Sequence, residues 1–138
     1  MEAAYIVALI GSGLAIATKT LKALNDLSHT FADTAQSTQL LVSRLSTVRA
    51  ALSHLEVILP SERAQRFMTS QLHGDLISAM QPCTVVMAAI HKHVHQIQEG
   101  WLKGKIRSVW DEGVIKEHGL HLDSQISALT LLLQVIQM

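Results

Sequence analysis

Residues 1–18, MEAAYIVALIGSGLAIAT, are the stretch that decides how this chain must fold. Glu2 carries the only charged side chain in it, and Lys19 is the first cation that follows. On a helix of 3.6 residues per turn, large side chains cover much of the surface: Tyr5, Ile6, Val7, Leu9, Ile10, Leu14 and Ile16. Small side chains form one narrow strip: Ala4, Ala8, Gly11 and Ala15. Because such a helix has almost no polar face, we expect it to be buried in protein, in lipid, or in each at different times.

The length of this stretch is marginal for a membrane anchor. Sixteen or so uncharged residues make about 24 Å of helix, while a bilayer core is about 30 Å thick. Lys19 and Lys22 can extend the usable length by reaching lipid headgroups, and Glu2 lies at the opposite end as a headgroup or pore charge. The absence of a basic segment before the apolar run argues against a secretory signal. We therefore predict a conditional inserter, in which the large side chains listed above face lipid.

The small strip has two predicted roles. In lipid, small side chains four residues apart allow helices to approach closely, so the strip is a candidate helix–helix contact. In the resting protein, we expect the same strip to lie where neighbouring helices of a bundle approach the first helix. The two roles are compatible if the helix is buried first and released later.

Composition points to a single all-α domain over residues 1–138. Nearly half of the residues are hydrophobic (49%) and only two are proline, which favours a bundle of about five helices. Eleven cations balance eleven anions, so bulk charge does not indicate a nucleic-acid partner. The single Cys83 excludes an intramolecular disulfide and is typical of a reducing compartment.

Downstream of the apolar stretch, the pattern predicts a series of amphipathic helices. The first helix should continue to about Phe31, and Asp33 or Ser37 is a candidate cap for the next. That second helix has a regular seam and should end at Pro60. Its seam consists of Leu41, Leu45, Val48, Leu52, Leu55 and Leu59.

Ser61 is predicted to begin a new helix, and the position of a break within residues 61–99 stays open. His73-Gly74 is one candidate, whereas Pro82 should kink rather than stop a helix. The next seam is Leu76, Met80, Cys83, Met87, Ile90, Val94 and Ile97. A shorter helix over 101–117 and a final helix opened by Asp123 complete the expected set. The final seam is Leu122, Ile126, Leu129, Leu133 and Ile136.

No motif predicts catalysis, a cofactor or a metal. Gly13 to Thr20 nearly spells a phosphate-binding loop, but Thr18 replaces the second glycine and no strand precedes it. His91 and His95 are one helical turn apart, but His93 points to another side, so solvent-facing histidines are favoured over a zinc site. Cys83 lies on a seam and is expected to be a small core residue.

The chain resembles the HeLo-like (HELL) N-terminal domains of fungal NOD-like (STAND) receptors and related cell-death proteins. The resemblance rests on apolar patterns across the whole chain. They are EAAYIVALIGSGLAIATKTLKAL, LLVSRLSTVRAALSHLEVIL, LISAMQPCTVVMAAI, KIRSVWDEGVI and LDSQISALTLLLQVI. It implies a helical bundle similar to the HeLo domains, the four-helix bundle of the necroptosis effector MLKL and the RPW-type plant resistance domains. It further implies a role in programmed cell death, innate immunity or heterokaryon incompatibility, executed by the N-terminal helix over residues 5–17.

The resulting expectation is a non-enzymatic effector domain that oligomerises and permeabilises membranes. It would be cytoplasmic at rest and move to the plasma membrane when a C-terminal or separate sensing module clusters several copies. Membrane lipids and other copies of the chain are the expected partners. The alternative is a helical signalling module that binds partner bundles through its seams and never contacts lipid.

Overall fold

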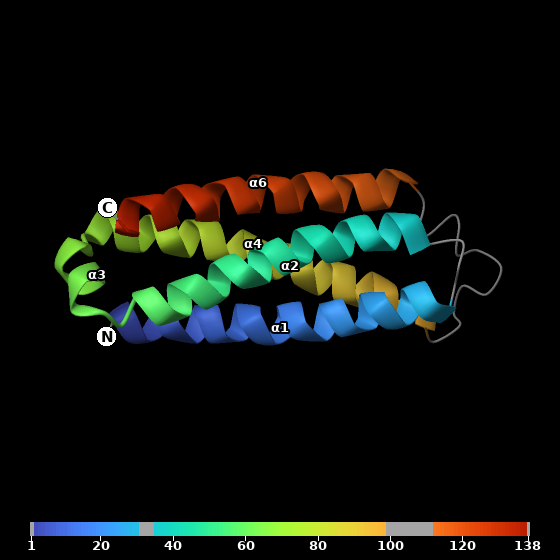
Figure 1. Cartoon of the computed structure of the whole chain (residues 1–138), viewed down its shortest axis with the longest axis horizontal. Helices are drawn as coiled ribbons and strands as arrows, with labels where there is room; N and C mark the ends of the chain where they lie inside the picture. The colour runs from blue at the N-terminus through green and yellow to red at the C-terminus, as the bar shows by residue number, and fades with distance from the viewer. Residues whose placement is uncertain (1, 31–34, 99–111, 138) are drawn as a thin grey trace.

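Every element that the structure describes is an α-helix. The computed structural model describes the backbone of residues 2–30, 35–98 and 112–137, and the side chains of 5–29, 38–66, 68–96 and 116–137. The helices are α1 (Glu2–Thr30), α2 (Ala35–Ile58), α3 (Glu62–Phe67), α4 (Ser70–Gln98) and α6 (Glu112–Gln137). Four of them are long and lie along one common axis, while α3 covers the end of the bundle near both termini (Figure 1). The predicted all-α bundle is confirmed.

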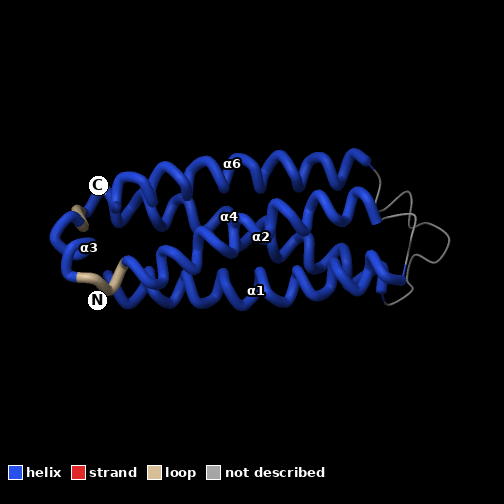
Figure 2. Tube along the Cα trace, in the orientation of Figure 1, coloured by secondary structure: helices blue, strands red, loops and turns tan. Residues whose placement is uncertain are grey.

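The four long helices form a closed ring. α1 packs against α2 and α4, and α6 packs against the same two helices, so α1 and α6 occupy diagonal corners. α1 and α4 run in one direction, and α2 and α6 run in the other (Figure 1). The chain passes from α2 to α4 through α3, which lies across the end of the bundle (Figure 2).

The predicted seams of α2 and α4 form the core. All six seam residues of α2 are buried, and so are those of α4 from Leu76 to Val94. On α6, Leu122, Leu129 and Ile136 are buried, whereas Ile126 and Leu133 are half-buried against the core. A spacing of alternating four and three residues keeps these side chains on one face of each helix, which explains the correct prediction.

The helix ends near Pro60 are as predicted, but the open break lies elsewhere. α2 ends at Ile58, and Ser61 caps α3 by accepting a hydrogen bond from the Ala64 amide at 3.2 Å. The break falls at Met68 and Thr69, where Met68 has an extended backbone. Thr69 then accepts from the amide of Leu72 at 3.1 Å, which satisfies one donor at the start of α4. α4 continues through His73-Gly74 and through Pro82.

Two predicted caps are wrong. Ser37 lies inside α2, which begins at Ala35. Asp123 lies in the middle of α6, where its Oδ1 accepts from the Nε of Arg44 on α2 at 3.0 Å. The Arg44 guanidinium lies close over Gly119, since a Cβ there would lie 2.5 Å from one of its nitrogens. Phe31, Asp33 and most of the helix predicted over 101–117 lie outside the described residues.

Candidate functional site: the outward face of the first helix

α1 divides into a core face and an outward face. The core face continues the seam pattern of the other helices, with steps of four and three residues. Its members are Ile6, Ile10, Gly13, Ala17, Thr20, Leu24 and Leu27, all of them buried. The apolar first half and the amphipathic second half of α1 therefore present one continuous seam to α2 and α4.

The outward face of α1 is exposed and uncharged over four turns. We define it by its exposed residues before the first cation: Tyr5, Val7, Ala8, Gly11, Ser12, Ala15 and Thr18. Lys19 and Lys22 are exposed immediately after it. A surface helix of a soluble protein ordinarily carries charged and polar residues on this side. This face instead leaves backbone and small apolar groups in contact with water.

The predicted insertion residues do not share one face. Ile6 and Ile10 are buried in the core, and Leu9, Leu14 and Ile16 are half-buried against it. Only Tyr5 and Val7 are exposed, at 48% and 51%. Insertion of all seven into lipid therefore requires α1 to leave the bundle. The side chain of Glu2 lies outside the described part of the chain.

The small strip is not where other helices approach α1 in the resting bundle, so that expectation is wrong. Ala8, Gly11 and Ala15 are exposed, and a Cβ at Gly11 would meet nothing within 4 Å. The side chain of Ala4 is not among those described. Close approach occurs at Gly13, where a Cβ would lie 3.1 Å from Leu52 Cδ1 of α2. The signal for Gly13 was present, because it continues the seam of Leu24 and Leu27 backwards along α1.

Three hydroxyl groups of α1, those of Tyr5, Thr18 and Thr20, have partners within the protein. Thr18 Oγ1 donates to the carbonyl of Leu14 at 2.9 Å, and Thr20 Oγ1 donates to that of Ile16 at 2.7 Å. Gln81 Nε2 of α4 donates to the Tyr5 hydroxyl at 3.0 Å, which links the start of α1 to α4. The two threonine bonds lie within α1 and would persist if α1 moved into lipid, so the hydroxyls would not be left unsatisfied there.

The other candidate residues show no catalytic arrangement in the described part of the chain. Cys83 is buried in the core as predicted, and burial raises its pKa from 9.0 to about 11, which opposes thiolate formation. The rings of His91 and His95 stack with centroids 6.3 Å apart. His93 was predicted to face solvent, and that prediction is wrong. Its ring bonds to His118 of α6. No group of three or more His, Cys, Asp or Glu among the described residues is placed to hold a metal ion.

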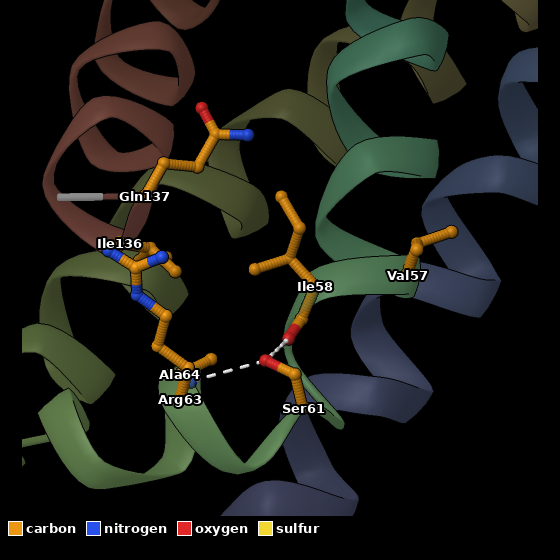
Figure 3. Close-up of a pocket in the computed structure, with 7 residues that line it drawn as sticks. All are labelled: Val57, Ile58, Ser61, Arg63, Ala64, Ile136 and Gln137. Atoms are coloured by element: carbon orange, nitrogen blue, oxygen red, sulfur yellow. Dashed lines mark hydrogen bonds between the residues drawn. The ribbon is translucent and has the colours of Figure 1, made fainter.

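A shallow pocket lies at the end of the bundle between α2, α3 and α6 (Figure 3). Its volume is about 530 Å³, and its lining is mainly apolar, with Val57, Ile58, Ala64 and Ile136. Ser61 holds the turn beside it, since its Oγ donates to the Ile58 carbonyl at 2.7 Å while accepting from Ala64 (Figure 3). The pocket is open to solvent, and its polar lining residues are Ser61, Arg63 and Gln137 (Figure 3).

Comparison with known proteins adds no relative: no protein-family model, no curated protein and no solved structure matches this chain. Among the described residues, one helical segment, Tyr5–His29, is long and apolar enough to cross a membrane by length and composition alone. One-third of its most apolar window is buried inside the bundle. The uncharged outward face of α1 is a feature of this fold that bundle packing does not explain.

Proposed function

We propose that this chain is a non-enzymatic effector domain of the HeLo-like type, which permeabilises membranes through α1 and so promotes cell death. The observation that carries the proposal is the outward face of α1, which is exposed and uncharged from Tyr5 to Thr18. A helix that serves only to complete a soluble bundle gains nothing from an uncharged outer side, since charged residues there would improve solubility. A helix that must also enter lipid is penalised for charge on any side of the part that lies in the bilayer core.

The geometry of α1 suits conditional insertion. The candidate span Tyr5–His29 has 25 residues, or about 37 Å of helix, against a bilayer core of about 30 Å. Its uncharged part ends at Lys19, so Lys19 and Lys22 would have to reach headgroups along the second half of the span. This is a weak membrane helix by itself.

Release from the bundle is the step that requires activation. Ile6 and Ile10 lie in the core, and each stabilises the resting fold by about 1.5–3 kcal/mol through burial. Lipid would bury the same side chains again, so the net drive for one copy is small. Clustering several copies would multiply weak membrane affinities by avidity, and the small strip would let released helices pack together in lipid. We infer that clustering by a sensing module controls the activity, with the protein cytoplasmic at rest and at the plasma membrane when active.

A matched pair of charge insertions tests this mechanism. Ala8→Lys places a cation on the outward face of α1, and Ala88→Lys places the same cation at an exposed position of α4. Both positions are exposed, so both variants should keep the folded bundle. A lysine in the middle of an inserted helix costs about 2.5–3.5 kcal/mol. Ala8 lies near the middle of the uncharged run over residues 3–18, so Ala8→Lys should reduce insertion of that run by about two orders of magnitude.

The measurement is dye release from vesicles of phosphatidylcholine and phosphatidylserine, with the protein fused to an inducible oligomeriser. We expect clustering to raise leakage for the parent and for Ala88→Lys, but not for Ala8→Lys. Equal leakage by both variants would refute a role for α1. Leakage that does not respond to clustering would refute the activation step.

A second candidate function is supported by a different surface. α6 exposes Leu120, Leu131 and Val135 on its outer side, and α2 exposes Val57 near the same end as Val135. Exposed apolar side chains on a helix are typical of binding to another helix, which would make the chain an interaction module. That function predicts that Leu131→Ser abolishes association with partners while vesicles stay intact with every variant.

A further inference from the structure

The contact between α4 and α6 contains a pair of histidines that bundle packing alone does not require. His93 Nδ1 of α4 and His118 Nε2 of α6 are 3.0 Å apart and share a hydrogen bond, with ring centroids 5.2 Å apart. His118 is buried, with 9% of its surface exposed, and His93 is half-buried. One ring must donate and the other must accept, so this bond needs a lone pair on one of the two facing nitrogens.

Protonation affects the contact in two stages. A first proton on an outer ring nitrogen leaves the facing nitrogens unchanged, so the hydrogen bond survives. A second proton places N–H groups on both facing nitrogens, so neither can accept, and two like charges then lie about 5 Å apart. The second proton therefore breaks the hydrogen bond between the two rings.

The surroundings favour the neutral form of His118. Burial, the neighbouring His93 and the nearby His121 lower its pKa below the ordinary value of 6.5, while Glu117 alone opposes them. On the side of α2, the Arg44 guanidinium lies over Gly119, next in the chain to His118, and pairs with Asp123. Lys116 is exposed two residues earlier than His118 in α6. Since the folded state binds the proton less readily than the unfolded state, the associated stability is complete above pH 6.5 and decreases as the pH falls below it.

We propose that the His93–His118 contact is an acid-sensitive latch, which closes α4 onto the amino-terminal half of α6 when at least one ring is neutral and opens when both are protonated. Within the described residues, α6 packs mainly against α2 and α4 among the long helices, so opening this contact loosens α6 on one of these two sides. α1 packs against α2 and α4 and lies diagonally opposite, so it stays in place when the latch opens. The latch is independent of the proposed membrane activity.

Hydrogen exchange and chemical unfolding of the full chain test the latch. For the parent, the urea midpoint should fall between pH 7.5 and pH 5.5. Over the same range, amide protection, corrected for intrinsic exchange, should fall at least tenfold in residues 116–125 and by less than twofold in residues 6–17. His118→Gln keeps a side chain that can bond to neutral His93 but does not titrate. The urea midpoint of this variant should therefore fall by less than half as much as that of the parent.

His54→Gln is the matched control, because His54 is exposed on α2 away from this contact. The urea midpoint of His54→Gln should fall between pH 7.5 and pH 5.5 by as much as that of the parent. An equal loss in His118→Gln and the parent, or equal deprotection of α1 and α6, would overturn the latch.

Nitrogen NMR of the parent's histidine rings provides a test that needs no variant. It should show His118 protonating below the ordinary histidine pKa, together with loss of the hydrogen bond between the two rings. Protonation of His118 at the ordinary histidine pKa, or a hydrogen bond that survives it, would also overturn the proposal.

Discussion

Leucine substitutions at the two glycines of α1 should have opposite effects on the stability of the bundle. Gly11 lies on the outward face, and a Cβ there would meet nothing within 4 Å. Gly13 lies on the core face, where a Cβ would come within 3.1 Å of Leu52, 3.9 Å of Thr84 and 4.0 Å of Met87. The two positions are two residues apart in the same helix, so each serves as the control for the other.

The magnitudes follow from helix propensity and from packing. Replacing glycine by leucine inside a helix gains about 0.8 kcal/mol at either position. At Gly11 no clash offsets this gain, so Gly11→Leu should be more stable than the parent by about 0.5–1 kcal/mol. At Gly13 the first added carbon is already tight against Leu52, and three more must fit between α2 and α4. Overpacking of this kind costs about 1–3 kcal/mol or more, so the net loss for Gly13→Leu should be about 2 kcal/mol.

Urea unfolding followed by circular dichroism at 222 nm measures both effects. The midpoint should rise for Gly11→Leu and fall for Gly13→Leu, without a change of slope. A stable Gly13→Leu, or a Gly11→Leu that loses more than about 1 kcal/mol, would refute the assignment of the two faces of α1. Because Gly11→Leu should leave the bundle intact, it is also a clean test of the small strip in lipid. We expect it to bind membranes but to crosslink into fewer oligomers than the parent.

Three further predictions concern single residues. Burial raises the pKa of Cys83 to about 11. At pH 8, iodoacetamide should therefore label Cys83 at least about 100-fold more slowly in the folded protein than in urea. Equal labelling rates would contradict the place of Cys83 in the core. Arg44 and Asp123 form a partly exposed ion pair. A double-mutant cycle with alanine should therefore give a coupling free energy of about 1 kcal/mol or less, which decreases in high salt. A much larger or salt-insensitive coupling would show that Arg44 and Asp123 are not a surface ion pair. The hydroxyl of Thr38 is buried and has no hydrogen-bond partner in the described structure. Thr38→Val should therefore raise the free energy of unfolding by about 1 kcal/mol. A decrease of that size would indicate a hydrogen bond of Thr38 that the structure does not show.

The sequence alone was sufficient for the all-α class and for the core faces of α2 and α4, although not for the start of α4 or of α6. Their seams alternate steps of four and three apolar residues, and this spacing by itself places Leu41 to Leu59 and Leu76 to Val94 on one side of a helix. The boundary between α2 and α3 was predicted from local causes. Pro60 lacks a backbone N–H, and the side chain of Ser61 caps α3. The apolar character of the first helix was equally local. In each case the physical cause acts within one or two turns of the chain.

Within the apolar stretch itself, only the tertiary structure decided which side of α1 faces the core. In a stretch with no charged side chain after Glu2, every face is apolar enough to be buried, so residue types could not rank the Gly11 side against the Gly13 side. That choice is made by the second half of the helix, where Leu24 and Leu27 enter the core and carry Gly13 inward with them. The partners of Asp123 and of His93 could not be predicted because they are distant in sequence. Arg44 is 79 residues from Asp123, and His118 is 25 residues from His93, so neither contact exists until the helices pack side by side.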